Sequence, residues 1–334
     1  MKQKQLAKLS TPGKIELAQA ALANDLVLLS KLVARIPGNA TQPGSTKYWA
    51  TRFLQWFEDR NGPAPFSIFS EKGNQKLPFH SFSSLPGFDC PGAGECLYSF
   101  GNARLPENFA KGWCYSFKAW RYPAAFFRQL QNSLLLRSAA GRVLIAKEFR
   151  EIPQGRTLRL YVDGDFANLT ILRFWMDLLK ERPDVKVTGR NPNEKAPREN
   201  GGDCDVYGYS KSWDLFLALE KEGYQFPENY LLNVSNGSRY GQEKKEKVKA
   251  LSCARGEFIA VPVARKHIQN KSYQDKDNAG SKEYRSEVLQ RLKEMGHGKR
   301  VACPGNCGNC LPNKGHACGS GSMQGETIAI GIHN

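Results

Sequence analysis

The stretch RTLRLYVDGDF, residues 156–166, has the pattern of a buried β-strand that ends in polar residues. Leu158, Leu160 and Val162 alternate along it, so their side chains share one face of the strand. The polar sequence Asp-Gly-Asp follows, and an amphipathic helix is then predicted over residues 169–184. A strand followed by a crossover helix is the building unit of a parallel sheet.

The same alternation continues along the rest of the sequence. Short apolar runs predict further strands over 185–190, 204–212, 229–238, 257–267, 300–303 and 326–334. Amphipathic patterns predict helices over 213–223, 242–251 and 281–296. We therefore expect an α/β fold with a mostly parallel sheet. An incomplete β/α barrel and an open doubly wound sheet both fit this order of elements.

Two regions of different composition flank this alternating part. Residues 1–62 predict a basic N-terminal helical region, whose aromatic residues recur at helical spacing and are expected in the core. The α/β domain is expected over residues 63–334, and its cysteine-rich segment, 303–318, is expected to be a metal loop. The stretch 66–106 is rich in Gly, Pro, Ser and Phe without periodicity, which is typical of a functional loop.

The sequence predicts a cytoplasmic location. No apolar run approaches the roughly 20 residues that span a bilayer, so no membrane partner is expected. The basic start of the sequence has the pattern of an amphipathic helix and not of a signal peptide. In a reducing cytosol stable disulfides are rare, so the nine cysteines call for another explanation.

Polar residues follow nearly every predicted strand, where parallel α/β proteins gather their functional side chains. The candidate catalytic residues are Asp163, Asp165, Tyr207, Tyr209 and Lys211. Later strands end in Asn233, Ser235, Asn236, Ser238, Arg265, Lys266 and His267. Asp165 is the strongest candidate, because Phe166 and the helix beyond it would hold it rigidly. Each single residue could instead cap a helix or form a turn, but the coincidence across several strands favours a site.

Four cysteines near the end form the strongest local signal. They are Cys303, Cys307, Cys310 and Cys318, within sixteen residues. Thiolates on short glycine-rich loops are the ligands of zinc and of iron–sulfur clusters, and the spacing leaves both metals open. The first three also have the spacing of radical-SAM enzymes, but a fourth thiolate would fill the open iron site that such chemistry needs. A histidine, His297 or His316, could replace one thiol.

A second group of cysteines lies upstream. Its members are Cys90, Cys96 and Cys114, and DCPGAGEC repeats the Cys-Pro-Gly opening of ACPGNC. These cysteines could form a second metal site or join the first one in space. The alternative is that they are small buried hydrophobic residues. Cys204 and Cys253 stand alone and are expected to be structural.

The net charge of +16 favours a polyanionic partner, because basic side chains that neutralise phosphates release condensed counterions. The candidate nucleic-acid-binding residues lie on one predicted helix and are Lys244, Lys245, Lys247 and Lys249. The alternative is that Glu243 and Glu246 partly neutralise this face, which would then be merely solvated.

The ordered motifs of the chain resemble those of a known family. They are CPGAGECLYSFGNAR, LRLYVDGDF, RFWMDLLKERPDV, VYGYSKSW and the late Cys-Pro cluster. Over roughly residues 85–320 the chain is similar to the phage gene-product-eighty-eight-like domain family. The resemblance implies a protein of phages or plasmids, and some members are labelled as rolling-circle replication proteins. Rolling-circle nicking itself is not expected, because no two histidines flank a single hydrophobic residue here.

Three functions follow from these patterns. The first is a phage- or plasmid-encoded protein with a cysteine-held metal centre that acts on or binds nucleic acid, in replication or maintenance of a mobile element. The second is an iron–sulfur barrel enzyme of radical-SAM-like ancestry that acts on a small molecule or nucleotide. The third is a zinc-stapled interaction protein without catalysis.

Overall fold

A seven-stranded sheet, parallel in every pairing, forms the centre of the computed structural model. The structure describes residues 11–60, 62–70, 80–94, 114, 116–153, 158–183, 187–188, 203–204, 206–264, 266–267, 282–304, 317–319 and 323–332. The strands are β1 (His80–Ser81), β2 (Leu158–Leu160), β5 (Val206–Ser210), β6 (Tyr230–Ser235), β7 (Ala254–Pro262), β8 (Arg300–Cys303) and β9 (Thr327–Ile332). Their order is β1-β2-β5-β6-β7-β9-β8. The predicted α/β fold with a parallel sheet is confirmed.

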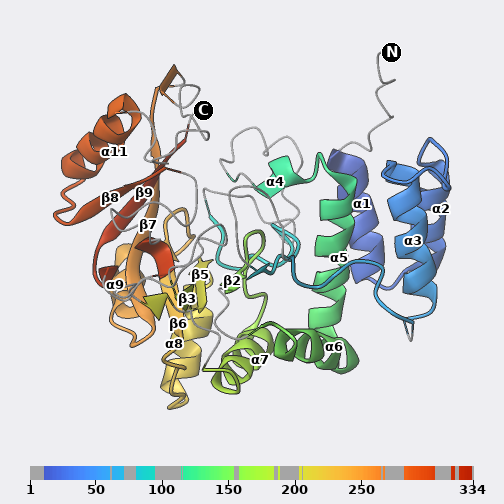
Figure 1. Ribbon diagram of the computed structural model, residues 1–334, viewed down its shortest axis with the longest axis horizontal. Coiled ribbons are helices and arrows are strands. Elements are labelled where there is room, and N and C mark those ends of the chain that lie inside the picture. Colours follow the sequence, from blue (N-terminus) through green and yellow to red (C-terminus); the bar gives the residue numbers. More distant parts are fainter. Residues whose placement is uncertain are drawn as a thin grey trace.

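The helices that connect the strands from β2 to β8 lie on one face of the sheet (Figure 1). They are α7 (Leu169–Lys180), α8 (Trp213–Lys221), α9 (Gln242–Lys249) and α11 (Lys282–Glu294). Helix α7 contacts α8, which in turn contacts α9. On β7, Glu257 pairs with a lysine of α9, and Ile259 packs in one cluster with side chains of α11. Alternate residues of a strand share a face, so α9 and α11 cover the same side.

One predicted strand lies outside the main sheet, and one strand of the sheet is out of chain order. The predicted strand over 185–190 forms β3 (Val187–Thr188), which pairs antiparallel with β4 (Asp203–Cys204) outside the main sheet. Strand β9 lies between β7 and β8, although it follows β8 in the chain. A central position satisfies backbone groups on both sides, and it is taken by the apolar sequence TIAIGI. The shorter sequence RVAC occupies the edge.

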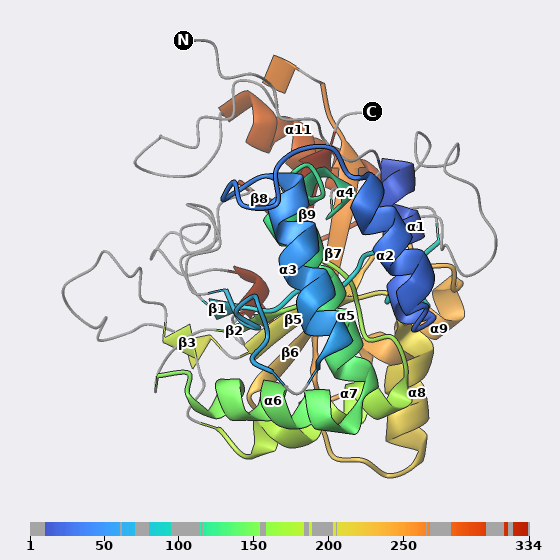
Figure 2. The ribbon, with the colours of Figure 1, turned by 90° about the vertical axis from the view of Figure 1, so that its right-hand side faces the viewer.

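The N-terminal helices pack together on the side of the molecule away from α11 (Figures 1 and 2). They are α1 (Thr11–Leu22), α2 (Leu26–Arg35) and α3 (Thr46–Glu58), and they pack beside α5 (Pro123–Arg137), which contacts α6 (Ala139–Arg150). The aromatic residues Phe53, Trp56 and Phe57 of α3 are buried, as their spacing predicted. Within the described residues, no helix combines the length and the apolar character that a membrane crossing needs.

The face of the sheet opposite the connecting helices carries polar and aromatic side chains. The guanidinium of Arg159 lies over the ring of Tyr209 at 4.6 Å, and this ring meets that of Phe258 edge-on at 4.5 Å. The short 3-10 helix η3 (Ala317–Gly319) packs against β5 and β6. The turn that carries Cys318 therefore lies on the polar face of the sheet.

The close packing of α11 on β9 provides a test of this arrangement. A Cβ atom on Gly331 would lie 2.6 Å from Tyr284 Cε2 and 2.8 Å from Val263 Cγ2. The Tyr284 hydroxyl is fixed, since it accepts a hydrogen bond from the Gly331 amide and donates one to the Cys303 carbonyl. Gly331→Ala is therefore expected to lower the free energy of unfolding by about 1–3 kcal/mol, measured by urea denaturation. Gly298→Ala is the control, because no atom lies within 4 Å of its added Cβ. Equal stability of the two variants would contradict the packing.

Candidate active site at the carboxyl edge of the sheet

Asp165, the strongest sequence-based candidate, is a buried acceptor of three hydrogen bonds beyond the end of β2. Its Oδ1 accepts from the Ser210 hydroxyl and from the Phe166 amide, each at 2.8 Å, and its Oδ2 accepts from the Lys211 amide at 2.8 Å. Burial raises the pKa of this carboxyl group, and the three hydrogen bonds oppose the rise. This geometry ties the end of β2 to the end of β5, so it favours a structural role for Asp165.

Asp163 has the properties of a proton-transfer group. Its carboxyl group is buried and accepts a hydrogen bond from Gln129 Nε2 at 2.9 Å. Gln129 Oε1 in turn accepts from the Trp120 indole at 2.8 Å, which fixes the orientation of the amide. Burial raises the pKa of Asp163 from 3.8 to about 6, against hydrogen bonds to Ser116 and the charge of Arg159. A carboxyl group with such a pKa can both accept and donate a proton near neutral pH.

Lys211 and Cys114 adjoin these two carboxyl groups. Lys211 Nζ donates to the Ser235 hydroxyl at 2.9 Å, which links the ends of β5 and β6. Burial raises the pKa of the Cys114 thiol, and the charge of Asp163 adds to the rise. The Ser116 hydroxyl and the positive charge of Lys211 oppose it. The structure thus brings Asp163, Asp165 and Lys211 together at one edge, along with one of the upstream cysteines.

Of the two candidate tyrosines, only Tyr209 has a described side chain. Tyr209 points onto the face of the sheet, between Arg159 and Phe258, and is not at the edge. The side chain of Tyr207 lies outside the described residues. Only the backbone of Tyr207 is placed, in the β5 ladder opposite Arg159 and Leu231.

The loop that carries Cys90 and Gly92, here called the first cysteine loop, packs against the same edge. Gly92 lies so close to Lys211 that an added Cβ would be 1.7 Å from the carbonyl oxygen of Lys211. The Ser238 hydroxyl donates both to the Gly92 carbonyl at 3.0 Å and to the Lys211 carbonyl at 3.1 Å. Cys90 in this loop is buried, and its Sγ accepts from the Gly87 amide at 3.4 Å. The loop therefore carries Cys90 to the strand ends, while Cys96 lies outside the described residues.

Two of the four late cysteines belong to one apolar cluster. Cys318 in η3 is a buried member of it, and Cys303 at the end of β8 packs against the cluster, as do Tyr209 and Phe258. The other two predicted ligands, Cys307 and Cys310, lie outside the described residues. Within the part of the chain that the structure describes, no three or more His, Cys, Asp or Glu side chains form a group that could hold a metal ion.

A histidine ligand from the start of β8 does not fit this cluster. His297 precedes β8, and its Nδ1 lies 3.1 Å from the hydroxyl of Thr327, the first residue of β9. Cys303 is the last residue of β8, so the two side chains lie at opposite ends of the strand. His316, the other histidine considered, lies outside the described residues.

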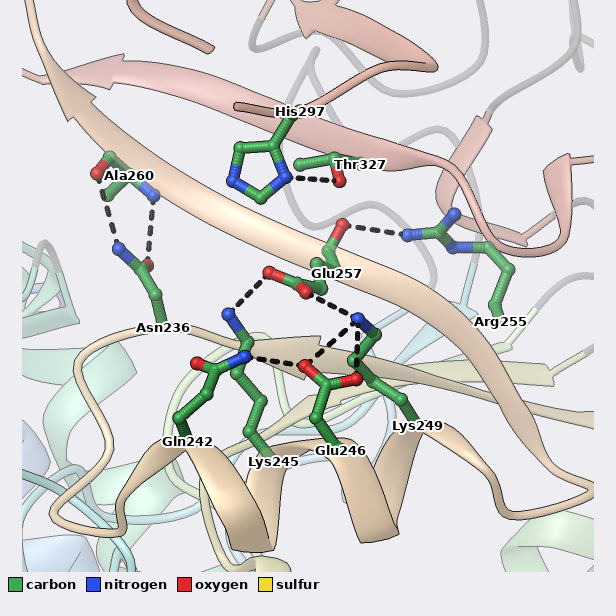
Figure 3. A network of polar contacts seen from close by, with 10 residues as sticks. All are labelled: Asn236, Gln242, Lys245, Glu246, Lys249, Arg255, Glu257, Ala260, His297 and Thr327. Atoms are coloured by element: carbon green, nitrogen blue, oxygen red, sulfur yellow. Dashed lines mark hydrogen bonds and ion pairs between the residues drawn. The ribbon is translucent and has the colours of Figure 1, made fainter. Parts of the chain in front are cut away.

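The four candidate nucleic-acid-binding lysines of α9 are engaged in ion pairs. Lys245 and Lys249 extend toward the sheet and hold Glu257 of β7 at 2.5 and 2.9 Å (Figure 3). Although burial opposes the shift, their hydrogen bonds lower the pKa of Glu257. Lys247 pairs with Glu243 at 2.7 Å, and Lys244 pairs with Asp214. Each of the four lysines therefore has a carboxylate partner, and phosphate binding by α9 stays a prediction.

Sequence reasoning missed the polar residues that α5 contributes. Gln129, Gln131, Asn132 and Ser133 are all buried, although they interrupt an otherwise apolar helix. Ser133 donates to Asp89 at 2.5 Å, and Asp89 pairs with Arg137 at 2.5 Å beneath the first cysteine loop. The available signal was this run of polar residues within the apolar sequence of α5, since buried polar groups must find partners.

No known protein family, curated protein or solved structure matches this chain. The resemblance to the phage gene-product-eighty-eight-like family therefore remains a prediction from its motifs.

The raised pKa of Asp163 predicts a pH-dependent stability. Well below pH 3.8 the carboxyl group is protonated in both the folded and the unfolded protein, so its raised pKa does not change the free energy of unfolding. Between pH 3.8 and about 6 the unfolded state releases the proton first, so the free energy of unfolding falls by about 3 kcal/mol. Asp163→Asn, which stays neutral, is expected to lack this loss in urea titrations from about pH 4 to about pH 7. Parallel pH profiles of the two proteins would contradict the raised pKa.

Proposed function

We propose that this chain is an enzyme built on an incomplete β/α barrel, with an acid–base site beside a cysteine-held metal centre. The substrate class that fits is a small polar molecule or nucleotide. Support for the barrel comes from the strand order, which advances without reversal from β1 to β7, and from connecting helices on one face. Right-handed crossovers that all advance in one direction produce this arrangement. In β/α barrels the active site lies at the carboxyl ends of the strands.

The observation that carries the proposal is the buried carboxyl group of Asp163 at that edge, where Lys211 follows the neighbouring strand β5. A buried carboxyl group with a pKa raised to about 6 exchanges its proton at little cost near neutral pH. In the proposed reaction, Asp163 transfers a proton to or from the substrate, and Gln129 keeps the carboxyl group oriented. Lys211, held by the Ser235 hydroxyl, provides a positive charge for an anionic group of the substrate.

The proposed metal centre would be held by Cys303 and Cys318 with Cys307 and Cys310. Support comes from the two described thiols, which reach one apolar cluster from different elements. Apolar surroundings and thiolate ligands suit either zinc or an iron–sulfur cluster. Bound zinc would stabilise the loop, and a bound cluster would supply electron transfer.

Replacement of one thiol tests the metal centre. Cys318→Ala is expected to lose most of the bound metal, because ligand loss removes metal-binding free energy. Cys253→Ala is the matched control, since Cys253 is equally buried but packs in the main core. Iron, zinc and sulfide would be measured per chain after purification without oxygen. A brown protein indicates an iron–sulfur cluster, and a colourless protein that contains zinc indicates a structural zinc site. Equal metal content in the two variants would overturn the assignment.

Nucleic-acid binding is the second candidate function, and the net charge of +16 supports it. The resemblance to a phage and plasmid family points the same way. Because the lysines of α9 have acidic partners, the interface would lie elsewhere on the surface.

Gel shifts over a salt series test this second candidate. Binding to DNA is expected to weaken with a log–log slope of about −0.9 for each phosphate contacted on a duplex. The double variant Lys244→Gln, Lys247→Gln is expected to keep this slope, because both lysines already pair with carboxylates. A slope flatter by about two units would instead place the interface on α9. Absence of binding at low salt would leave the enzyme as the remaining proposal.

A further inference from the structure

The turn that carries Cys318 is held onto the sheet by one buried side chain. Asn233 lies in β6 with no exposed surface, and its Nδ2 donates to the Cys318 carbonyl at 2.8 Å. The same Nδ2 donates to the Gly208 carbonyl of β5 at 3.2 Å. One amide group therefore joins two neighbouring strands and the cysteine-bearing turn.

Arg255 fixes the orientation of this amide. Its Nε donates to Asn233 Oδ1 at 2.6 Å, so Asn233 must present Nδ2 to the Cys318 carbonyl. The rest of the guanidinium group donates to the carbonyls of Met323 and Glu326 at 3.0 Å each, and to that of Glu257 at 3.0 Å. Figure 3 shows the contact between Arg255 and Glu257. Arg255 therefore ties the chain beyond Cys318 to the sheet as well.

A local irregularity of β7 brings Arg255 to this position. The pairing of β6 with β7 shifts register between Leu232 and Asn233, where Asn233 lies opposite Gly256. Gly256 has φ of +153°, and an added Cβ would lie 2.5 Å from the Glu326 carbonyl oxygen. A β-bulge of this kind changes the face of the sheet to which the neighbouring side chain points. Arg255 consequently points to the face that bears η3, while Glu257 points to the face that bears α9.

We infer that Asn233, oriented by Arg255, is a positioning residue that holds the Cys318 thiol in place for the metal. The inference rests on the proposed metal centre. A ligand held by outer hydrogen bonds loses little conformational freedom when it binds the metal, and loss of such partners typically costs 10–100-fold in metal affinity. Asn233 touches the backbone of the ligand residue and not its sulfur, so it acts through the placement of the turn.

The variant Asn233→Asp tests this role with little change in size. The carboxylate can still accept from Arg255 Nε, but it can no longer donate to the carbonyls of Cys318 and Gly208. Asn236→Asp is the matched control, because Asn236 directly follows β6 and its side chain likewise bridges to a neighbouring strand, β7. Its Nδ2 donates to the Ala260 carbonyl at 3.3 Å and its Oδ1 accepts from the Ala260 amide at 2.9 Å (Figure 3), and neither of these hydrogen bonds involves Cys318.

Two readouts separate this inference from the proposed function. The first is the rate of metal loss to a chelator, expected to rise about 10–100-fold in Asn233→Asp and to stay unchanged in Asn236→Asp. The second is alkylation of Cys318 by iodoacetamide in metal-free protein, followed by peptide mass mapping with buried Cys253 as the internal reference. Alkylation of Cys318 is expected to accelerate in Asn233→Asp alone.

The outcomes are distinct. Equal rates of Cys318 alkylation in the two variants would overturn the positioning role, whatever the metal content. A wild-type protein that holds no metal would overturn the metal centre, while the alkylation rates still decide whether Asn233 positions Cys318. If Asn233→Asp fails to fold, Arg255→Lys replaces it. That variant keeps the buried positive charge but loses the forked donors to Asn233 and the carbonyls, so the same two rates are expected to rise.

Discussion

The carboxyl edge of the sheet depends on the hydrogen bonds of the buried Asp165 carboxylate. Strand β2 has only three residues, and its register with β5 covers only two pairs. Beyond that short ladder, Asp165 binds the Ser210 hydroxyl and the Lys211 amide and so continues the connection between the two strands. A carboxylate that accepts several hydrogen bonds is a strong and specific tie in a buried site. It fixes the distance between the segment that carries Asp163 and the segment that carries Lys211.

The two faces of the sheet have different chemical character. The face under the connecting helices is closed by apolar packing, as for Leu158, Leu160 and Leu232. The opposite face buries Arg159, Arg255 and Asn233, whose desolvation is costly unless each group is hydrogen-bonded. Such groups hold a segment in one arrangement, because any shift would leave a buried polar atom without its partner. The polar face is thus suited to fix the cysteine-bearing turn, and the polar edge is suited to hold a substrate.

Much of this organisation could be predicted from the sequence, because it follows from periodicity. The alternation of strands and helices and the burial of the α3 aromatic residues both follow from spacing along one element. The convergence of Asp163, Asp165 and Lys211 could also be anticipated, since parallel strands end at the same edge. The sequence could not distinguish their roles, because the pKa of Asp163 depends on burial under α5, an element far away in the chain.

The other features that the sequence could not predict have the same physical origin. The eight residues of α9 include four lysines and no apolar stripe, with Val248 as its one buried residue, so periodicity could not show which lysines turn inward. Only the neighbouring strand, which supplies Glu257, decides this. The bulge at Gly256 and the place of β9 are likewise set by pairing between segments and not by local preference.

The position of β9 between β7 and β8 constrains the order in which the strands can join the sheet during synthesis. In the seven-stranded sheet β8 pairs with β9 alone, so it cannot join the sheet before residues 327–332 have left the ribosome. During translation, β1 to β7 can pair in succession, while β8 waits for a later segment. Cys303, the last residue of β8, therefore reaches the apolar cluster that contains Cys318 only at the last stage of folding, after the rest of the sheet has formed.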